Sequence, residues 1–120
     1  MARILVVDDS DLMRTYLKST LERAGHTVSL AKNGVELLTL YEEICPDIVT
    51  LDIIMPVMNG VDTCRALIKA HPDAKIVMCS SMGQNFYIRE AIEAGARDFI
   101  IKPFDATNVV ESVNKVLLQP

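Results

Sequence analysis

The sequence predicts a single domain of the doubly wound α/β class, in which five parallel strands alternate with five helices. Two observations support this class. Short runs rich in β-branched residues alternate strictly with longer stretches that have helical hydrophobic spacing. The runs Ile4–Val7 and Asp47–Leu51 are nearly continuous in apolar character, which is typical of strands covered by helices on both faces. A chain of 120 residues, half of them hydrophobic, suffices for one core, so we expect one domain over residues 1–120.

Each predicted strand is a short apolar run bounded by polar or turn-forming residues. In chain order, the predicted strands are Arg3–Asp8, Thr27–Ala31, Asp47–Asp52, Lys75–Ser80 and Arg97–Ile101. Their spatial order is not visible in the pattern. Because crossovers between parallel strands are right-handed, helices on both faces of the sheet leave only a few arrangements.

Between the strands lie five stretches whose apolar residues recur at helical spacing. Gly25 and Gly95 follow the first and fourth stretches and suit a left-handed cap at a helix end. In chain order, the apolar positions that mark the five predicted helices are Leu12, Tyr16, Leu17 and Leu21; Val35, Leu38 and Tyr41; Val61, Cys64, Leu67 and Ile68; Ile88, Ala91 and Ile92; and Val109, Val110, Val113 and Leu117.

Composition excludes several classes of protein. The net charge is −4, whereas a module that binds duplex nucleic acid normally carries a basic stripe, so direct nucleic-acid binding is disfavoured. The apolar runs are far shorter than the ~20 residues needed to span a bilayer, so we expect no membrane insertion. Three cysteines without a Cys-x-x-Cys pair disfavour a disulfide framework or a zinc site, and a reducing cytoplasmic location fits.

The candidate functional residues are the polar residues at the ends of the predicted strands. In open α/β sheets, ligands bind outside the carboxyl ends of the strands. The first predicted strand ends in Asp8 and Asp9, the third in Asp52, the fourth in Ser80, and Lys102 follows the fifth. If these strands are neighbours, three carboxylates, a hydroxyl and an ammonium group meet at one edge of the sheet.

Such a set of groups favours phosphoryl transfer. Three crowded carboxylates repel one another, which should raise the pKa of at least one of them, and hard oxygen ligands select Mg²⁺. A hydroxyl and an ammonium beside a metal bind phosphoryl oxygens, and a carboxylate can itself be the nucleophile. Each residue alone has a structural explanation as a helix cap, a turn residue or a solvated charge. The joint pattern favours an aspartyl phosphate.

The sequence resembles the receiver domain of two-component response regulators over essentially its whole length. The segments that carry the resemblance are Val6-Val7-Asp8-Asp9-Ser10, Asp52-Ile53-Ile54-Met55-Pro56-Val57-Met58-Asn59-Gly60, Cys79-Ser80-Ser81 and Asp98-Phe99-Ile100-Ile101-Lys102-Pro103-Phe104. An acidic pair or a lone Lys-Pro is a weak signal, but all four segments in order at strand ends are highly specific. The resemblance implies a flavodoxin-like sheet with strand order 2-1-3-4-5.

The resemblance also implies a role for each residue of the site. Asp52 is the implied phosphoacceptor, with Ser80 and Lys102 as its catalytic partners. Mg²⁺ is the implied cofactor, and its ligands would be Asp9, Asp8 through water, Asp52 and the backbone carbonyl of Ile54. Ser80 and Phe99 occupy the switch positions, and the Lys102–Pro103 peptide bond is expected to be cis.

Two stretches, Cys79-Ser80-Ser81-Met82-Gly83-Gln84 and Glu90-Ala91-Ile92-Glu93-Ala94-Gly95-Ala96, make the chain resemble the stand-alone chemotaxis regulators of the family (CheY type). This similarity implies a cytoplasmic monomer that is phosphorylated by a sensor histidine kinase and binds a flagellar motor switch protein, with a phosphatase as a further partner. Its output surface would be the fourth helix, fifth strand and fifth helix. Catalysis would be limited to its own phosphorylation and dephosphorylation, so we expect no enzyme with an external substrate. Ile54 and Met82 are apolar near the expected path of the attacking water, which predicts slow self-dephosphorylation.

Four other functions stay open at this stage. The chain could be a phosphorelay intermediate, or a receiver excised from a larger transcriptional regulator. A phosphatase with an aspartyl nucleophile would resemble a short Asp-x-Asp motif, which Asp8-Asp9 does not supply. A flavodoxin-like electron carrier would need a phosphate loop rich in hydroxyl groups and glycine, which the segment after the first strand does not resemble.

Overall fold

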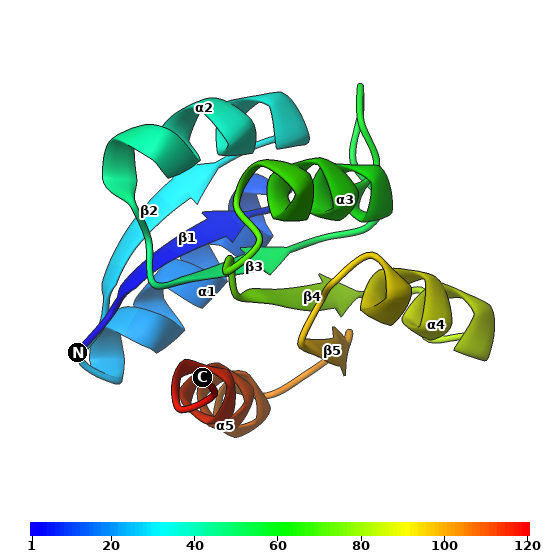
Figure 1. The fold of residues 1–120 in the computed structure, drawn as a ribbon. Helices are drawn as coiled ribbons and strands as arrows, with labels where there is room; N and C mark the ends of the chain where they lie inside the picture. The colour runs from blue at the N-terminus through cyan, green and yellow to red at the C-terminus, as the bar shows by residue number, and fades with distance from the viewer.

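The computed structural model describes all residues from Met1 to Pro120 and has the predicted class (Figure 1). Its ten elements are, in chain order, β1 Arg3–Val7, α1 Asp11–Arg23, β2 Thr27–Ala31, α2 Gly34–Ile44, β3 Ile48–Leu51, α3 Gly60–Ala70, β4 Ile76–Ser80, α4 Asn85–Glu93, β5 Asp98–Ile101 and α5 Ala106–Leu117. Every predicted element is present, so the alternation seen in the sequence is confirmed. None of the helices combines the length and apolar character that crossing a bilayer requires.

The five strands form one parallel sheet in the order β2-β1-β3-β4-β5, as the resemblance implied. Strands β1 and β3 lie side by side at its centre, with Val7 opposite Leu51. Strand β5 forms one edge, beside β4, and Ser80 lies opposite Ile101. The order therefore places the ends of β1 and β3 next to each other and brings the end of β5 within one strand of them.

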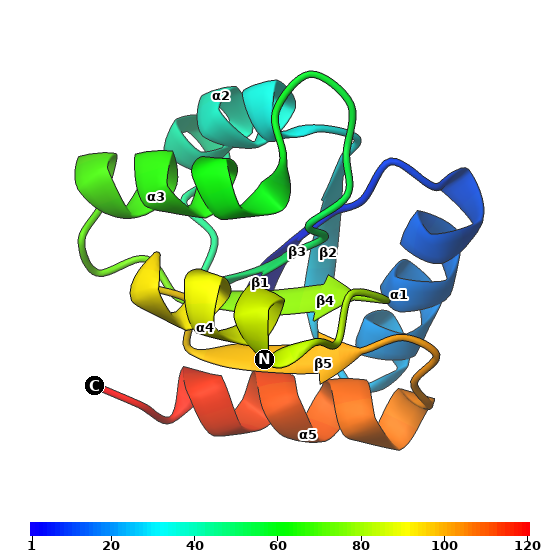
Figure 2. The ribbon, with the colours of Figure 1, turned by 90° about the vertical axis from the view of Figure 1, so that its right-hand side faces the viewer.

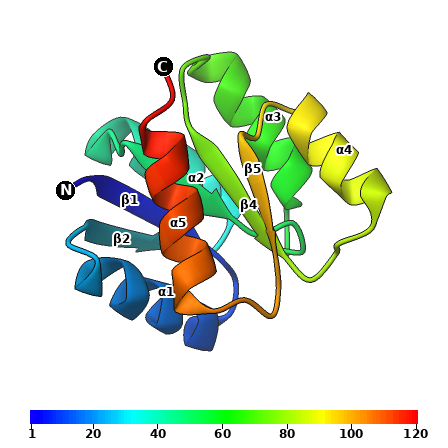
Figure 3. The same ribbon diagram turned by 90° about the horizontal axis from the view of Figure 1, so that it is seen from below.

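Helices cover both faces of the sheet (Figures 2 and 3). Helices α2, α3 and α4 enclose a core cluster of 17 buried residues on one face, which includes Leu37, Leu67 and Met78. Helices α1 and α5 enclose a second cluster of 12 buried residues, which includes Leu21 and Val113. The central strands are buried on both faces, which explains their nearly continuous apolar sequence.

The strand ends differ from the prediction by one residue at several places. Asp8 and Asp52 were predicted as the last residues of their strands, but the structure ends β1 at Val7 and β3 at Leu51. Each aspartate still donates its backbone N–H to a neighbouring strand, Asp8 to Ala31 O at 3.2 Å and Asp52 to Val7 O at 3.0 Å. The two residues are thus held by the sheet on one side, while their carbonyl groups already belong to loops.

Candidate functional site

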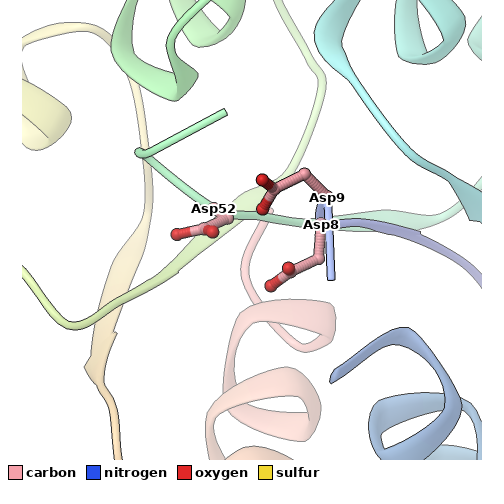
Figure 4. Close-up of side chains that lie close together, drawn as sticks. All are labelled: Asp8, Asp9 and Asp52. Carbon is pink, nitrogen blue, oxygen red and sulfur yellow. The ribbon is translucent and has the colours of Figure 1, made fainter. Parts of the chain in front are cut away.

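Three carboxylates meet at the carboxyl edge of the sheet (Figure 4). Asp8 and Asp9 follow β1, and Asp52 follows the adjacent strand β3. One carboxylate oxygen from each lies within 4.8 Å of the others. Asp8 and Asp52 are buried, whereas Asp9 is exposed. The register of β1 against β3 therefore brings together the three acidic residues that the sequence singled out.

The Asp8 side chain is fully engaged with protein groups. Its Oδ1 accepts the backbone N–H of Ser10 at 2.9 Å, and its Oδ2 accepts from Lys102 Nζ at 2.8 Å. Asp9 forms no hydrogen bond or ion pair within the protein. A cation at this acidic cluster would thus find Asp9 without a protein partner and Asp8 already bonded to Ser10 and Lys102. The water-mediated role of Asp8 stays a prediction.

Lys102 contacts two of the three carboxylates. Its Nζ lies 2.8 Å from Asp8 Oδ2 and 3.5 Å from Asp52 Oδ2, and its side chain is 17% exposed. The backbone N–H of Lys102 donates to Ser80 O at 2.8 Å, which ties the end of β5 to the end of β4. The Lys102–Pro103 peptide bond is cis, as the resemblance implied.

Burial and the neighbouring charges together shift two pKa values at this site. Burial alone would lower the pKa of Lys102, but its hydrogen bond to Asp8 and the negative charges of Asp52 and Asp8 raise it overall, so the ammonium form is stabilised. The pKa of Asp52 is also raised, chiefly because the carboxylate is buried; Lys102 opposes this and Asp8 adds to it. The predicted direction is confirmed for Asp52, but burial contributes more than the predicted repulsion.

The donor set fits a hard divalent cation. All the side-chain donors are carboxylate oxygens, and Mg²⁺ prefers such ligands while it keeps several water molecules. Asp9 is exposed, so a cation bound to it would stay in contact with solvent. The predicted contribution of the Ile54 carbonyl stays a prediction, and the Ile54 side chain points largely to solvent, with 55% of its surface exposed.

Ser80 and Phe99 do not belong to the carboxylate cluster. Ser80 is completely buried at the end of β4, and its Oγ accepts the backbone N–H of Met82 at 3.1 Å. It makes no hydrogen bond to the three carboxylates. Phe99 is partly buried and packs against the core cluster under α2, α3 and α4. The two residues lie on the adjacent strands β4 and β5, where Met78 is opposite Phe99.

Two residues at the site were not assigned a role from the sequence. Arg14, on the first turns of α1, donates its Nη1 to the backbone carbonyl of Asp8 at 2.5 Å. Gly60, at the start of α3, donates its N–H to Ile53 O at 2.7 Å and lies against the backbone of Asp52. A lone arginine on an amphipathic helix carries no pattern that distinguishes it from a surface charge, whereas a glycine just after the Asp52 segment is a residue type that permits a close backbone approach.

Comparisons with known proteins agree with this geometry. The model of the response regulator receiver domain matches residues 4–114. The chemotaxis protein CheY of Thermotoga maritima is 51% identical over 115 residues, which cover 95% of this chain and 96% of that protein. The CheY of Bacillus subtilis is 45% identical over 96% of this chain and 97% of its own length.

A solved structure of a chemotaxis complex supports the same family assignment. The structure of a complex of CheX, CheY, BeF3 and Mg²⁺ from Borrelia burgdorferi contains a chain that superposes with a TM-score of 0.93 at 30% identity, covering 98% of this chain and 90% of that one. The family model spans most of the sequence, and the curated relatives match over nearly their full lengths. The chain therefore belongs to the receiver domains of two-component response regulators and is of the CheY-like chemotaxis type.

Proposed function

We propose that this protein is a phosphorylation-activated switch in which Asp52 accepts a phosphoryl group from a sensor histidine kinase. The observation that carries the proposal is the convergence of Asp8, Asp9 and Asp52 with Lys102 at the ends of neighbouring strands. In the transfer, an Asp52 carboxylate oxygen forms a bond to phosphorus while the P–N bond of the donor phosphohistidine breaks. The electron pair of that bond stays on the imidazole nitrogen, and the product is an acyl phosphate.

The surrounding residues have separate tasks in this step. Lys102 holds a positive charge beside Asp52 and would neutralise phosphoryl oxygens as negative charge gathers in the pocket. A bound Mg²⁺, held by Asp9, by Asp52 and through water by Asp8, would supply further charge neutralisation. The Ser80 hydroxyl, now held by Met82 N–H, would move to donate to the phosphoryl group. No substrate other than the phosphodonor is needed, so we propose no enzymatic activity beyond the protein's own phosphorylation and dephosphorylation.

The proposed output is a change at the surface formed by α4, β5 and α5. Movement of Ser80 toward the phosphoryl group would vacate space beside β5, and Phe99 would turn into it. Phe99 has no hydroxyl, so packing alone holds the inward ring. We propose a flagellar motor switch protein as the target of the phosphorylated form. A phosphatase that resembles the CheX bound by the Borrelia protein is a further partner. The switch would act as a cytoplasmic monomer.

Labelling with acetyl phosphate tests the phosphoacceptor directly. Asp52→Asn is nearly isosteric but cannot form an acyl phosphate, so we expect no incorporated phosphate by intact-mass spectrometry. Asp73→Asn, a change of the same type at an exposed loop position, is the control and should label like the wild type. Undiminished label on Asp52→Asn would move the acceptor to another residue.

Two further measurements test the output and the lifetime. Retention of a flagellar motor switch protein only in the presence of beryllofluoride supports the chemotaxis output, whereas transfer of the phosphoryl group to a histidine phosphotransfer protein favours the phosphorelay alternative. Decay of the acyl phosphate should be faster in Ile54→Asn and Met82→Glu than in the wild type, because each adds a polar group beside the attacking water. Equal lifetimes in all three proteins would exclude this role for the two side chains.

A further inference from the structure

We propose that Arg14 is a positioning residue for the metal site, which fixes the Asp8–Asp9 peptide so that the Asp9 carboxylate faces the pocket. Its guanidinium donates Nη1 to the Asp8 carbonyl at 2.5 Å and Nη2 to the Asp11 carboxylate. The Arg14 side chain is only 13% exposed, whereas that of Asp11 is 93% exposed. The guanidinium is therefore largely buried where it contacts the Asp8 carbonyl, and the exposed Asp11 carboxylate contacts it from the solvent side.

The Asp8 carbonyl has no other partner. Asp8 donates its N–H to Ala31, but its carbonyl accepts no backbone N–H, since β1 has already ended at Val7. Rotation of this peptide would turn the Cα–Cβ bond of Asp9 away from Asp52. Asp9 itself forms no hydrogen bond or ion pair in the protein. No protein group fixes the Asp9 rotamer, so the backbone decides only where its Cα–Cβ bond starts. Arg14 holds that backbone at the Asp8 carbonyl, and the Asp8 carboxylate holds it at the Ser10 N–H.

Positioning and simple electrostatics predict opposite effects when Arg14 is replaced. A positive charge near three carboxylates competes with a bound cation, so its loss should tighten Mg²⁺ binding if charge alone mattered. If Arg14 positions Asp9, its loss should weaken binding, because a metal site whose supporting groups are removed typically loses about tenfold or more in affinity. The sign of the change therefore separates the two roles.

Titration of the intact protein with Mg²⁺ by isothermal calorimetry, at constant ionic strength, shows whether replacing Arg14 raises or lowers the Mg²⁺ affinity. We expect Arg14→Gln to weaken Mg²⁺ binding by about tenfold. Arg14→Lys keeps the charge but loses the planar two-pronged guanidinium, so we expect a loss of about threefold. The matched control is Arg23→Gln, the same charge change at the exposed far end of α1, which should bind Mg²⁺ as the wild type does.

A second readout uses the phosphorylation reaction. The Mg²⁺ concentration that gives half the maximal rate of labelling by acetyl phosphate should rise in Arg14→Gln by the same factor as the dissociation constant. Circular dichroism checks that each variant is folded; if Arg14→Gln does not fold, Arg14→Lys carries the test. Binding by a folded Arg14 variant that is as tight as in the wild type, or tighter, would overturn the positioning role.

This inference rests on the proposed function, and the two fail differently. Wild-type protein that takes up no Mg²⁺ would overturn the metal-dependent function itself. Wild-type protein that binds Mg²⁺, together with Arg14 variants that bind it equally well, would leave the proposed function standing and remove only the role of Arg14.

Discussion

Helices α4 and α5 both pack beside β5, on opposite faces of the sheet (Figure 2). Helix α5 has 12 residues, four of them buried, and the Asp105 carboxylate caps it by accepting the N–H of Asn108. Lys75 Nζ also donates to the carbonyls of Leu117 and Gln119 at its end, at 3.1 and 2.7 Å. Helix α4 has nine residues, of which only Ala91 is buried, and its first residue follows Gln84, which makes no side-chain cap.

The difference indicates which part of the proposed output surface is held less firmly. Phe86 and Ile92 of α4 are 62% and 47% exposed, and the side-chain ion pair that ties the helix to α3 joins the partly exposed groups Arg65 and Glu90. Few buried contacts and an exposed ion pair characterise segments that open at low free-energy cost. Helix α5 and the carboxylate edge of the sheet are held firmly, so a phosphoryl signal would act mainly on α4 and the loop before it.

The largest expected effect lies on the firmly held side, at Gly60. A Cβ on this residue would lie 2.0 Å from the Asp52 carbonyl oxygen and 2.7 Å from the Cα of Ile53, and these backbone atoms cannot rotate away. We expect Gly60→Ala to destabilise the protein by about 3 kcal/mol, at the upper end of overpacking costs, and to reduce labelling of Asp52. Urea unfolding followed by circular dichroism measures the loss.

Gly25 is the matched control, because a Cβ there meets nothing within 4 Å although its φ is +95°. Gly25→Ala should cost about 1 kcal/mol, from the backbone conformation alone. If the two alanine variants lost equal stability, the close approach of Gly60 to Asp52 would not constrain the site.

The second prediction compares the two helices directly. Val113 of α5 is completely buried, so Val113→Ala should cost roughly 2 kcal/mol from lost apolar burial and the cavity that remains. Ile92 of α4 is 47% exposed, so Ile92→Ala should change the free energy of unfolding by less than about 0.5 kcal/mol although it removes more atoms. Equal losses would show that α4 is packed as firmly as α5.

The third prediction concerns the charge buried at Asp52. Because burial raises the pKa of Asp52 in the folded protein, the folded state holds a proton at this carboxyl to higher pH than the unfolded chain does. Wild-type stability without metal therefore falls as the pH rises above the ordinary value of 3.8. Asp52→Asn lacks this effect and should be the more stable protein at pH 7 in EDTA.

The advantage of Asp52→Asn should disappear below that ordinary value, where the carboxyl is protonated in both states. We expect an effect smaller than that of Val113→Ala, because the attraction of Lys102 opposes the effect of burial. Thermal unfolding of both proteins between pH 3 and pH 7 measures the difference. An Asp52→Asn protein that is less stable than the wild type at pH 7 would show that the pairing with Lys102 outweighs burial.

The carboxyl edge of the sheet, which is firmly held, is also the region that the sequence predicted well. Apolar runs that end in aspartate, serine and lysine locate the strand ends, and a parallel sheet then brings those ends to one edge, so Asp8, Asp52 and Lys102 were predicted together. The one-residue errors at β1 and β3 arise because Asp8 and Asp52 keep a single hydrogen bond to the sheet. Arg14 was missed because its contact is with a backbone carbonyl, and sequence patterns record side chains rather than the peptide that a side chain reaches.

The looseness of α4 was only partly visible in advance. Four of the helices begin after Ser, Asn or Asp, which are common helix caps, whereas α4 begins after Gln84. The absence of a capping residue before α4 is therefore visible in the sequence. It does not show that Ala91 is the single buried residue of α4, because Ile88 and Ile92 give the same helical spacing as a well-packed helix, and burial depends on the neighbouring elements.

The smallest expected effect sharpens the comparison by supplying that cap. The backbone of Gln84, at φ −68° and ψ 148°, is close to that of Asn59, which caps α3 at φ −70° and ψ 162°. In Gln84→Ser the new Oγ would lie where it can accept the N–H of Tyr87, as Ser10 accepts that of Met13 in α1. Tyr87 N–H already reaches the Gln84 carbonyl at 3.0 Å, so the gain should be about 0.5 kcal/mol, at the low end for a cap.

Amide hydrogen exchange shows where this gain appears. Protection should rise in α4 and stay constant in α5, because the cap stabilises a local opening rather than the whole fold. Asp105→Ser, which exchanges one capping residue for another on α5, is the control and should leave the protection of α4 unchanged. If the looseness of α4 serves the switch, the capped variant should also show a smaller change in α4 exchange on adding beryllofluoride and Mg²⁺. An unaltered response in a variant with demonstrably slower α4 exchange would mean that the switch does not depend on the weak start of this helix, and the movement would then have to lie in the loop between Ser80 and Gln84.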